Sequence, residues 1–213
     1  MTTVRREDIL LVAARLFAHN GVASSTVREI ADAAGLMSGS LYHHFDSKAA
    51  MVEAIVMAFL HDLQGRYAAA VRAAAGDPRE CLGALIRASF AAVDAHPYAT
   101  EIYQNDRAFL RALPSHGRLR AVALDVQQTW LDVLAAGIAG GRFRGDVPPA
   151  VLYRLIRDAV WRSVHGFTPT PGYSRARLAA DCTAIFLDGI APARPSPRPS
   201  VVGAAGAGDQ RVP

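Results

Sequence analysis

The sequence predicts an all-α protein in which an N-terminal three-helix helix-turn-helix domain precedes a larger helical domain. Apolar residues recur every three or four positions along most of the chain, which is the period of one helix face. Capping residues and glycines divide this pattern into helix-sized segments. No segment alternates with the two-residue period of a strand, and the absence of a GxGxxG or P-loop sequence disfavours a nucleotide-fold enzyme.

The first predicted helix carries one apolar stripe. Its members lie about one turn apart on the same face: Ile9, Ala13, Leu16 and Phe17. Gly21 follows as a stop signal. A second helix is predicted from Val27 to Gly35, because Thr26 and Glu29 have the spacing of a capping box.

A short third helix is predicted over residues 38–45, with Leu41 and Phe45 facing the core because they are four positions apart. Its other side chains then face outward, where they can reach phosphates or base edges: Gly39, Ser40, Tyr42, His43 and His44. A capped helix, a turn and a second short helix are typical of a helix-turn-helix. By pattern alone, DNA binding and an ordinary surface helix are equally supported.

The net charge of this region does not decide between these two alternatives. Residues 1–50 contain five basic and five acidic side chains, so binding to DNA would depend on where the charges lie. Arg28 stands at the start of the second helix and Lys48 at the start of the fourth. Both are expected to meet phosphates there, beside the positive ends of the helices.

The remaining chain predicts a helical domain followed by a tail. Ser47 caps a long fourth helix, and Asp77, Pro78 and Glu80 form a start signal for the fifth. Further helices are predicted over residues 98–107, 119–139, 149–166 and 174–189. The end of the chain is rich in proline, glycine and alanine and is predicted to be disordered. We therefore expect a DNA-binding domain over residues 1–46, a ligand-binding and dimerisation domain over 47–190 and a tail over 191–213.

Composition limits the class of protein further. The 213 residues are 51% hydrophobic, which is ordinary for a globular protein, but no run approaches the roughly 18 apolar residues of a membrane span. The N-terminus has no apolar signal segment, so we expect a cytoplasmic protein. Cys81 and Cys182 are expected to be free thiols. The histidines lack metal-ligand spacing, so neither a metal nor a cofactor is expected.

Two features of the larger domain suggest a ligand. Residues 107–120 contain four basic side chains and no acidic one: Arg107, Arg111, Arg118 and Arg120. A second set recurs every four residues on one face of a predicted helix: Tyr153, Arg157, Trp161 and His165. An arginine between two aromatic side chains suits a phosphorylated ligand with a flat ring, because a guanidinium binds phosphate and an indole stacks on a base.

Each of these features also has a plain structural explanation. The basic stretch can be a solvated loop between two helices. The aromatic face can be packing at a dimer interface, with Arg157 paired to Asp158 or Asp181. Trp130 fits either core packing or the wall of a pocket.

The segment LFAHNGVASSTVREIADAAGLMSGSLYHHFDSKAAMVEAIV strongly resembles the DNA-binding region of TetR-type transcriptional regulators. The shared motifs are F-x-x-x-G, T-V-x-x-I-A-x-x-A-G and S-L-Y-x-H-F-x-S-K, within roughly residues 9–56. The resemblance implies an all-helical homodimer that binds a palindromic double-stranded DNA operator with its first three helices. By position it implies DNA contacts from Thr26, Val27, Arg28, Ser38, Gly39, Ser40, Tyr42, His43 and Lys48.

Segments of the larger domain look like one TetR subgroup: IYQ at Ile102–Gln104, WLDVLAAGIAGGRFRGD at Trp130–Asp146 and YRLIRDAVWRSV at Tyr153–Val164. This subgroup contains a bacterial repressor of the late, ring-degrading part of cholesterol catabolism, which is relieved by coenzyme A (CoA) thioesters of partly degraded sterol rings. The resemblance implies an acyl-CoA ligand, with Arg157 and Trp161 engaging the CoA moiety. The expected ligand-binding residues are Tyr103, Arg107, Trp130, Tyr153, Arg157 and Trp161.

Two other functions are alternatives to a repressor that responds to an acyl-CoA. A repressor of the same type can sense an uncharged hydrophobic molecule, as in drug-efflux control, but the arginine stretch and the Arg157–Trp161 face favour the acyl-CoA. An enzyme or carrier acting on acyl-CoA is disfavoured, because no nucleophile–base pair or acid pair is visible and the helix-turn-helix would be unexplained.

Overall fold

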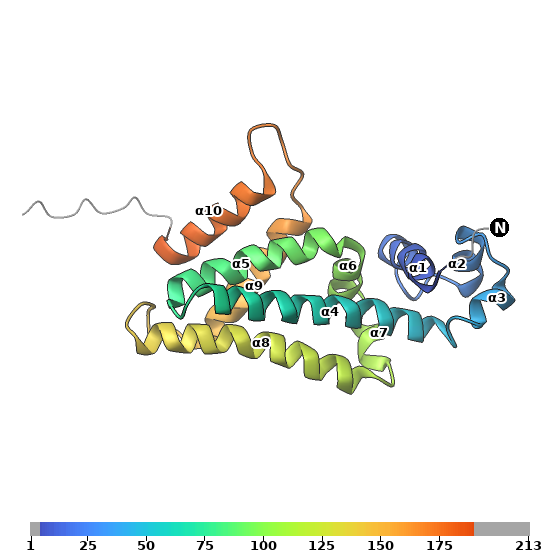
Figure 1. The fold of residues 1–213 in the computed structure, drawn as a ribbon, viewed down its shortest axis with the longest axis horizontal. Coiled ribbons are helices and arrows are strands. Elements are labelled where there is room, and N and C mark those ends of the chain that lie inside the picture. Colours follow the sequence, from blue (N-terminus) through green and yellow to red (C-terminus); the bar gives the residue numbers. More distant parts are fainter. Residues whose placement is uncertain (1–4, 190–213) are drawn as a thin grey trace, which may run out of the picture.

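The computed structural model describes residues 5–189, apart from the side chain of His165, and folds them almost wholly into α-helices (Figure 1). The helices are α1 Arg6–Asn20, α2 Val27–Ala33, α3 Ser38–Tyr42, α4 Lys48–Ala73, α5 Pro78–Ala95, α6 Pro97–Asn105, α7 Arg107–Ala112, α8 His116–Ala139, α9 Pro149–His165 and α10 Arg175–Asp188. This confirms the all-α prediction. The tail predicted over 191–213 lies outside the described residues. None of the described helices combines the length and hydropathy of a membrane span.

The predicted helix starts are confirmed atom by atom. The Oγ1 of Thr26 accepts from the backbone N–H of Glu29 at 3.2 Å, and the Glu29 carboxylate accepts from the Thr26 N–H at 2.7 Å. This is the reciprocal capping box that the sequence predicted for α2. Ser47 caps α4 through the N–H of Ala50, and Asp77 caps α5. Local side chains therefore set where these helices begin.

Several helix boundaries differ from the prediction. The third helix ends at Tyr42, although Phe45 still lies buried in the core as expected. The basic stretch after residue 107, for which a solvated loop was one alternative, contains α7, a helix of six residues that buries Leu110. A helix of this length shows less than two turns of periodicity, so its pattern is not visible in the sequence.

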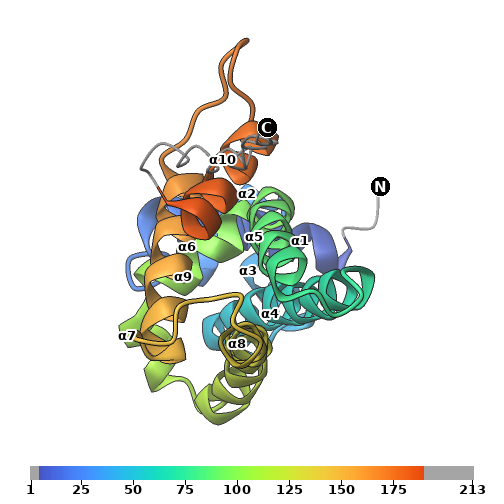
Figure 2. The ribbon, with the colours of Figure 1, turned by 90° about the vertical axis from the view of Figure 1, so that its left-hand side faces the viewer.

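The helices form two parts joined by α4. The first three lie at one end of the elongated molecule, and α4 runs from them into the larger part (Figure 1). There α4, α5 and α8 pack against one another, and α9 packs on α5 and α8. The view along the molecule shows α10 on the outside, where it rests mainly on α5 (Figure 2). One continuous hydrophobic core extends through both parts.

Lys48 ties the first part to the start of α4. Its Nζ donates to the carbonyl oxygens of Val22 at 2.7 Å, Ser25 at 2.8 Å and Ala23 at 3.3 Å. An ammonium has three donors, so all of them are used inside the protein. The DNA-phosphate contact expected for Lys48 stays a prediction, and a phosphate would have to share the ammonium with these three carbonyls. In the described chain Lys48 holds the loop between α1 and α2, residues 21–26, which we call the α1–α2 loop.

The same loop is attached to the junction of α6 and α7. The backbone N–H of Val22 donates to the Asp106 carboxylate at 3.2 Å, and Asp106 separates these two helices. In α7 the ring centroid of Phe109 lies 5.9 Å from the Lys48 ammonium. Helices α1 and α6 also pack together. The α1–α2 loop is therefore held between α4 and the α6–α7 junction.

We predict that Lys48→Met lowers the thermal stability of the protein. The variant loses three charge-assisted hydrogen bonds and leaves carbonyls without a donor, which is worth about 3 kcal/mol. For a chain of this size the unfolding midpoint should fall by roughly 6–12 °C in a circular dichroism melt.

Arg28→Met is the matched control, because Arg28 is 86% exposed and lies 3.9 Å from Asp32, which is the geometry of a weak surface pair. Its melting midpoint should stay close to that of the wild type. Equal midpoints for Lys48→Met and Arg28→Met would show that the loop does not depend on the ammonium.

Candidate functional site

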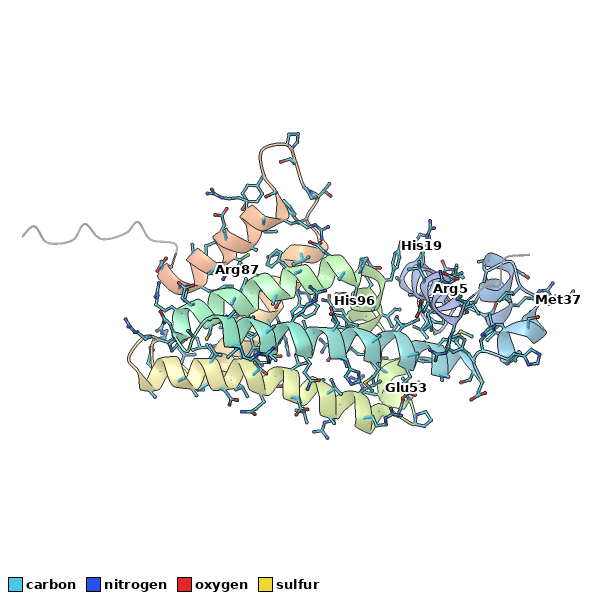
Figure 3. The ribbon with its side chains drawn as sticks, viewed as in Figure 1. Arg5, His19, Met37, Glu53, Arg87 and His96 are labelled. Atoms are coloured by element: carbon cyan, nitrogen blue, oxygen red, sulfur yellow. The ribbon has the colours of Figure 1, made fainter. Side chains whose placement is uncertain are left out.

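The outer end of the helix-turn-helix presents the side chains that the sequence predicted to face outward. Gly39, Ser40, Tyr42 and His43 are exposed, whereas Leu41 between them is fully buried. Figure 3 shows Met37, the residue before α3, at the far tip of the molecule, and its side chain is 82% exposed. The face of α3 opposite the core is thus exposed in the described part of the chain.

The start of α2 lies beside this face and contributes to it unevenly. Thr26 and Arg28 are exposed, and Val27 and Ser38 are half-buried. The Thr26 side chain is already engaged with Glu29 in the capping box. Arg28 is therefore the side chain of this group whose charge is most available to an anion.

A cavity of about 570 Å³ lies in the larger part, at the level where α4, α6, α7, α8 and α9 come together. All six residues that were predicted to bind a ligand line this one cavity: Tyr103, Arg107, Trp130, Tyr153, Arg157 and Trp161. They come from four helices, α6, α7, α8 and α9. The fourth member of the aromatic face, His165, has no described side chain.

Arginines dominate the rim of the cavity. Five line it: Arg107, Arg111, Arg120, Arg157 and Arg162. Asp158 is the one acidic side chain in this lining. All of the arginines except Arg157 are exposed, so they stand at the solvent side. Three of the four arginines in the basic stretch therefore converge on the cavity, while the fourth, Arg118, pairs with Glu53 at 3.3 Å.

The inner wall is aromatic and rigid. Trp161 meets Phe59 edge to face with ring centroids 5.8 Å apart, and Phe59 meets Tyr103 at 5.9 Å. Trp130 is likewise packed between two tyrosine rings, Tyr67 and Tyr153. Such aromatic pairs hold each other in fixed orientations. Trp130 thus packs in the core and also forms part of the cavity wall. The sequence offered these two roles as alternatives.

Arg157 joins the rim to this inner wall. Its guanidinium donates to Asp158 at 2.7 and 2.9 Å and lies 5.3 Å from the centre of the Tyr153 ring. Of the two partners that the sequence offered, Asp158 is used, because Asp181 is bound by Arg177 and Tyr173. The pair with Asp158 is partly open to solvent, so an incoming anion can compete for the guanidinium.

The two phenols beside Arg157 remain neutral. Burial raises the pKa of Tyr103 and of Tyr153, although the nearby Arg157 charge acts in the opposite direction on both. Each phenol therefore keeps its proton at neutral pH and offers an O–H donor to a ligand oxygen. The cavity combines a cationic rim, neutral donors and an apolar interior.

Sequence reasoning missed several residues of the lining. Arg162, Gln104 and Gln127 contribute polar groups, and five leucines contribute apolar surface: Leu60, Leu63, Leu110, Leu119 and Leu124. A leucine in a cavity wall follows the same helical period as a leucine in the core, so its pattern carries no signal. Gln104 lies inside a segment that resembles the subgroup, but the resemblance implies no role for it.

Comparison with known proteins matches both parts of the chain to one family. The sequence pattern described as "Bacterial regulatory proteins, tetR family" matches residues 9–55, and that described as "Tetracyclin repressor-like, C-terminal domain" matches residues 75–190. The helix-turn-helix and the cavity-bearing domain are therefore both accounted for.

Individual relatives are similar over most of their length. The HTH-type transcriptional repressor KstR2 of Rhodococcus jostii is 41% identical over 187 residues, which is 88% of this chain and 91% of that protein. The structure of the ketosteroid transcriptional regulator KstR2 of Mycobacterium tuberculosis superposes with a TM-score of 0.81 at 38% identity, covering 91% of this chain and 98% of that one. The structure of AibR in complex with isovaleryl coenzyme A and operator DNA has the same fold, with a TM-score of 0.76 at 21% identity, covering 85% and 97% of the two chains.

These matches confirm the resemblance that the sequence showed. The identity to KstR2 covers the helix-turn-helix and the cavity alike. The chain belongs to the TetR family of bacterial regulatory proteins, as a DNA-binding transcriptional repressor and not an enzyme.

Proposed function

We propose that this repressor binds a palindromic operator as a cytoplasmic homodimer and releases it when a CoA thioester enters the cavity. The observation that carries the proposal is the set of five arginines around an aromatic interior. An anionic ligand held among these like charges would be attracted by each of them. We also propose that residues 1–46 form the DNA-binding domain and that residues 47–190 form the domain for ligand binding and dimerisation.

The two halves of a CoA thioester suit the two halves of the cavity. Guanidinium groups bind phosphate and pyrophosphate oxygens in a forked geometry, which suits the rim. The adenine offers a flat ring for Trp161, and the acyl group offers apolar surface to the interior. The volume of about 570 Å³ is typical of a small-molecule site.

The relatives support the same ligand class. KstR2 of Mycobacterium tuberculosis is described as a ketosteroid transcriptional regulator, which favours an acyl group derived from a steroid. AibR, which shares the fold, holds isovaleryl coenzyme A together with operator DNA. The alternative is an uncharged hydrophobic effector, and it leaves the five arginines of the rim unexplained.

The proposed DNA contacts lie on α2 and α3. They are Thr26, Val27, Arg28, Ser38, Gly39, Ser40, Tyr42 and His43. A Cβ added at Gly39 would meet no other atom within 4 Å, so the backbone there is open to a groove. Lys48, at the start of α4, is also proposed to meet a phosphate, and it holds the α1–α2 loop in place. Two such domains in a dimer would read two half-sites about one helical turn apart.

Dimerisation is proposed through α9 and α10. Cys182 and Ala179 of α10 are buried against the rest of the chain, whereas Ile185 is 48% exposed and Leu155 of α9 is 55% exposed. Large apolar side chains exposed on neighbouring helices are what a self-complementary helix pair requires.

Ligand release is proposed to act through the α6–α7 junction. Tyr103 and Arg107 face the cavity from either side of this junction, and Asp106 between them accepts from Val22 of the α1–α2 loop. A ligand that repositions Arg107 therefore disturbs the support of α2. The same ligand must then bind less tightly when the operator is present.

We predict that Ile185→Asp separates the dimer. The substitution would bury a charge at the proposed interface, and light scattering at micromolar concentration should report the mass of a monomer. Leu11→Asp makes the same chemical change on an exposed leucine of α1 and should leave a dimer. A wild type of monomeric mass would contradict the interface altogether.

We predict that Arg157→Ala weakens CoA-thioester binding tenfold to a hundredfold, because a charge-assisted contact of roughly 1.5–3 kcal/mol is lost. Calorimetry with a panel of acyl-CoAs measures this, and operator binding without ligand should be unchanged. Arg154→Ala removes an exposed arginine of the same helix that does not line the cavity, and should bind like the wild type. If no CoA thioester binds, the uncharged-effector alternative is favoured.

A further inference from the structure

One polar atom of the cavity wall stands out because it is buried and makes no hydrogen bond. This atom is Nε2 of Gln104, near the end of α6. A buried N–H group without an acceptor is costly, and most such groups in folded proteins find one. The amide N–H group can therefore donate to an acceptor on a ligand, because the described residues supply none.

We infer that Gln104 donates a hydrogen bond to a carbonyl oxygen in the acyl half of the ligand and so selects which acyl group is sensed. The inference rests on the proposed function. The inference adds to the proposed function a binding residue, Gln104, and a ligand group, the carbonyl oxygen. The arginine rim alone implies neither of them.

The position of Gln104 relative to the rim favours the acyl half. Arg107, three residues further along the chain, is exposed at the solvent side, whereas the Gln104 amide nitrogen is closed off from solvent. Phosphates held by the rim arginines would thus lie outside the amide, and the acyl group would lie against it.

The chemistry of the amide fits a neutral acceptor. Gln104 carries no charge, so it offers a carbonyl a directional donor without the non-specific pull of a guanidinium. A site built to hydrogen-bond a ligand oxygen rejects ligands that lack it, because the buried donor is then left unpaired. The acceptor is either the thioester carbonyl or a keto oxygen further along the acyl chain, and these two sources are separable by ligand choice.

The test is calorimetry of the wild type, Gln104→Met and Gln128→Met with free CoA, hexanoyl-CoA and 5-oxohexanoyl-CoA. Methionine keeps the length of glutamine and removes its donor. Gln128 is exposed on α8 and does not line the cavity, so Gln128→Met is the matched control. Gln104→Met should lower the affinity for a carbonyl-bearing ligand by roughly threefold to thirtyfold and leave free CoA unaffected.

The ligand at which the loss first appears identifies the acceptor. A loss already present with hexanoyl-CoA assigns the thioester carbonyl, and a loss confined to 5-oxohexanoyl-CoA assigns the remote keto oxygen. Equal loss for free CoA, or no loss for any ligand, overturns the inference while leaving the proposed function intact. A wild type that binds none of the three overturns the proposed function and this inference with it.

A second readout separates a ligand donor from a structural role. Since the amide nitrogen makes no bond within the protein, the ligand-free Gln104→Met variant should melt at or above the wild-type midpoint. A lower midpoint in a circular dichroism melt, with unchanged ligand selectivity, would show that the side chain supports the fold and not the ligand.

Discussion

The attachment of the α1–α2 loop at two points is the constraint on which the rest of the molecule depends. The Lys48 ammonium donates hydrogen bonds to three carbonyl oxygens of this loop. The Asp106 carboxylate accepts a hydrogen bond from the backbone N–H of Val22 in the same loop. The loop leads directly into α2 and thus fixes where α2 and α3 stand. Asp106 also separates α6 and α7, two of the helices that line the cavity. The DNA-binding part and the cavity therefore meet through a few hydrogen bonds and not through a broad interface alone.

The cavity joins two kinds of surface that rarely share one site. Its rim contains arginines from α7, α8 and α9, and its interior combines leucines with aromatic rings that pack edge to face. Arg157 belongs to both, because it contacts Asp158 at the opening and the Tyr153 ring within. Such a site suits a molecule that is charged at one end and apolar at the other. This polarity of the cavity is the physical basis of the proposed CoA thioester.

Much of this architecture was predictable because it depends on local sequence. The capping residues Thr26, Ser47 and Asp77 mark helix starts in the sequence as they do in the structure. The four-residue spacing of Tyr153, Arg157 and Trp161 places them on one helix face, and all three line the cavity.

What was not predictable depends on contacts between distant segments. Lys48 reaches carbonyls more than twenty residues earlier, so its position in the sequence suggests a phosphate contact but gives no sign of these hydrogen bonds. The buried state of Gln104 arises only when α6 and the other cavity helices come together. The short α7 contains too few residues to show a period, and its presence turns a basic loop into part of a binding site.

The central claim is that the cavity and the DNA-binding face are energetically linked, and the most direct measurement of this is the affinity for one CoA thioester with and without operator. Linkage requires the operator to weaken ligand binding by the same factor by which the ligand weakens operator binding. The account predicts equal factors, both well above one. Ligand binding that is unchanged by a saturating amount of operator would contradict it.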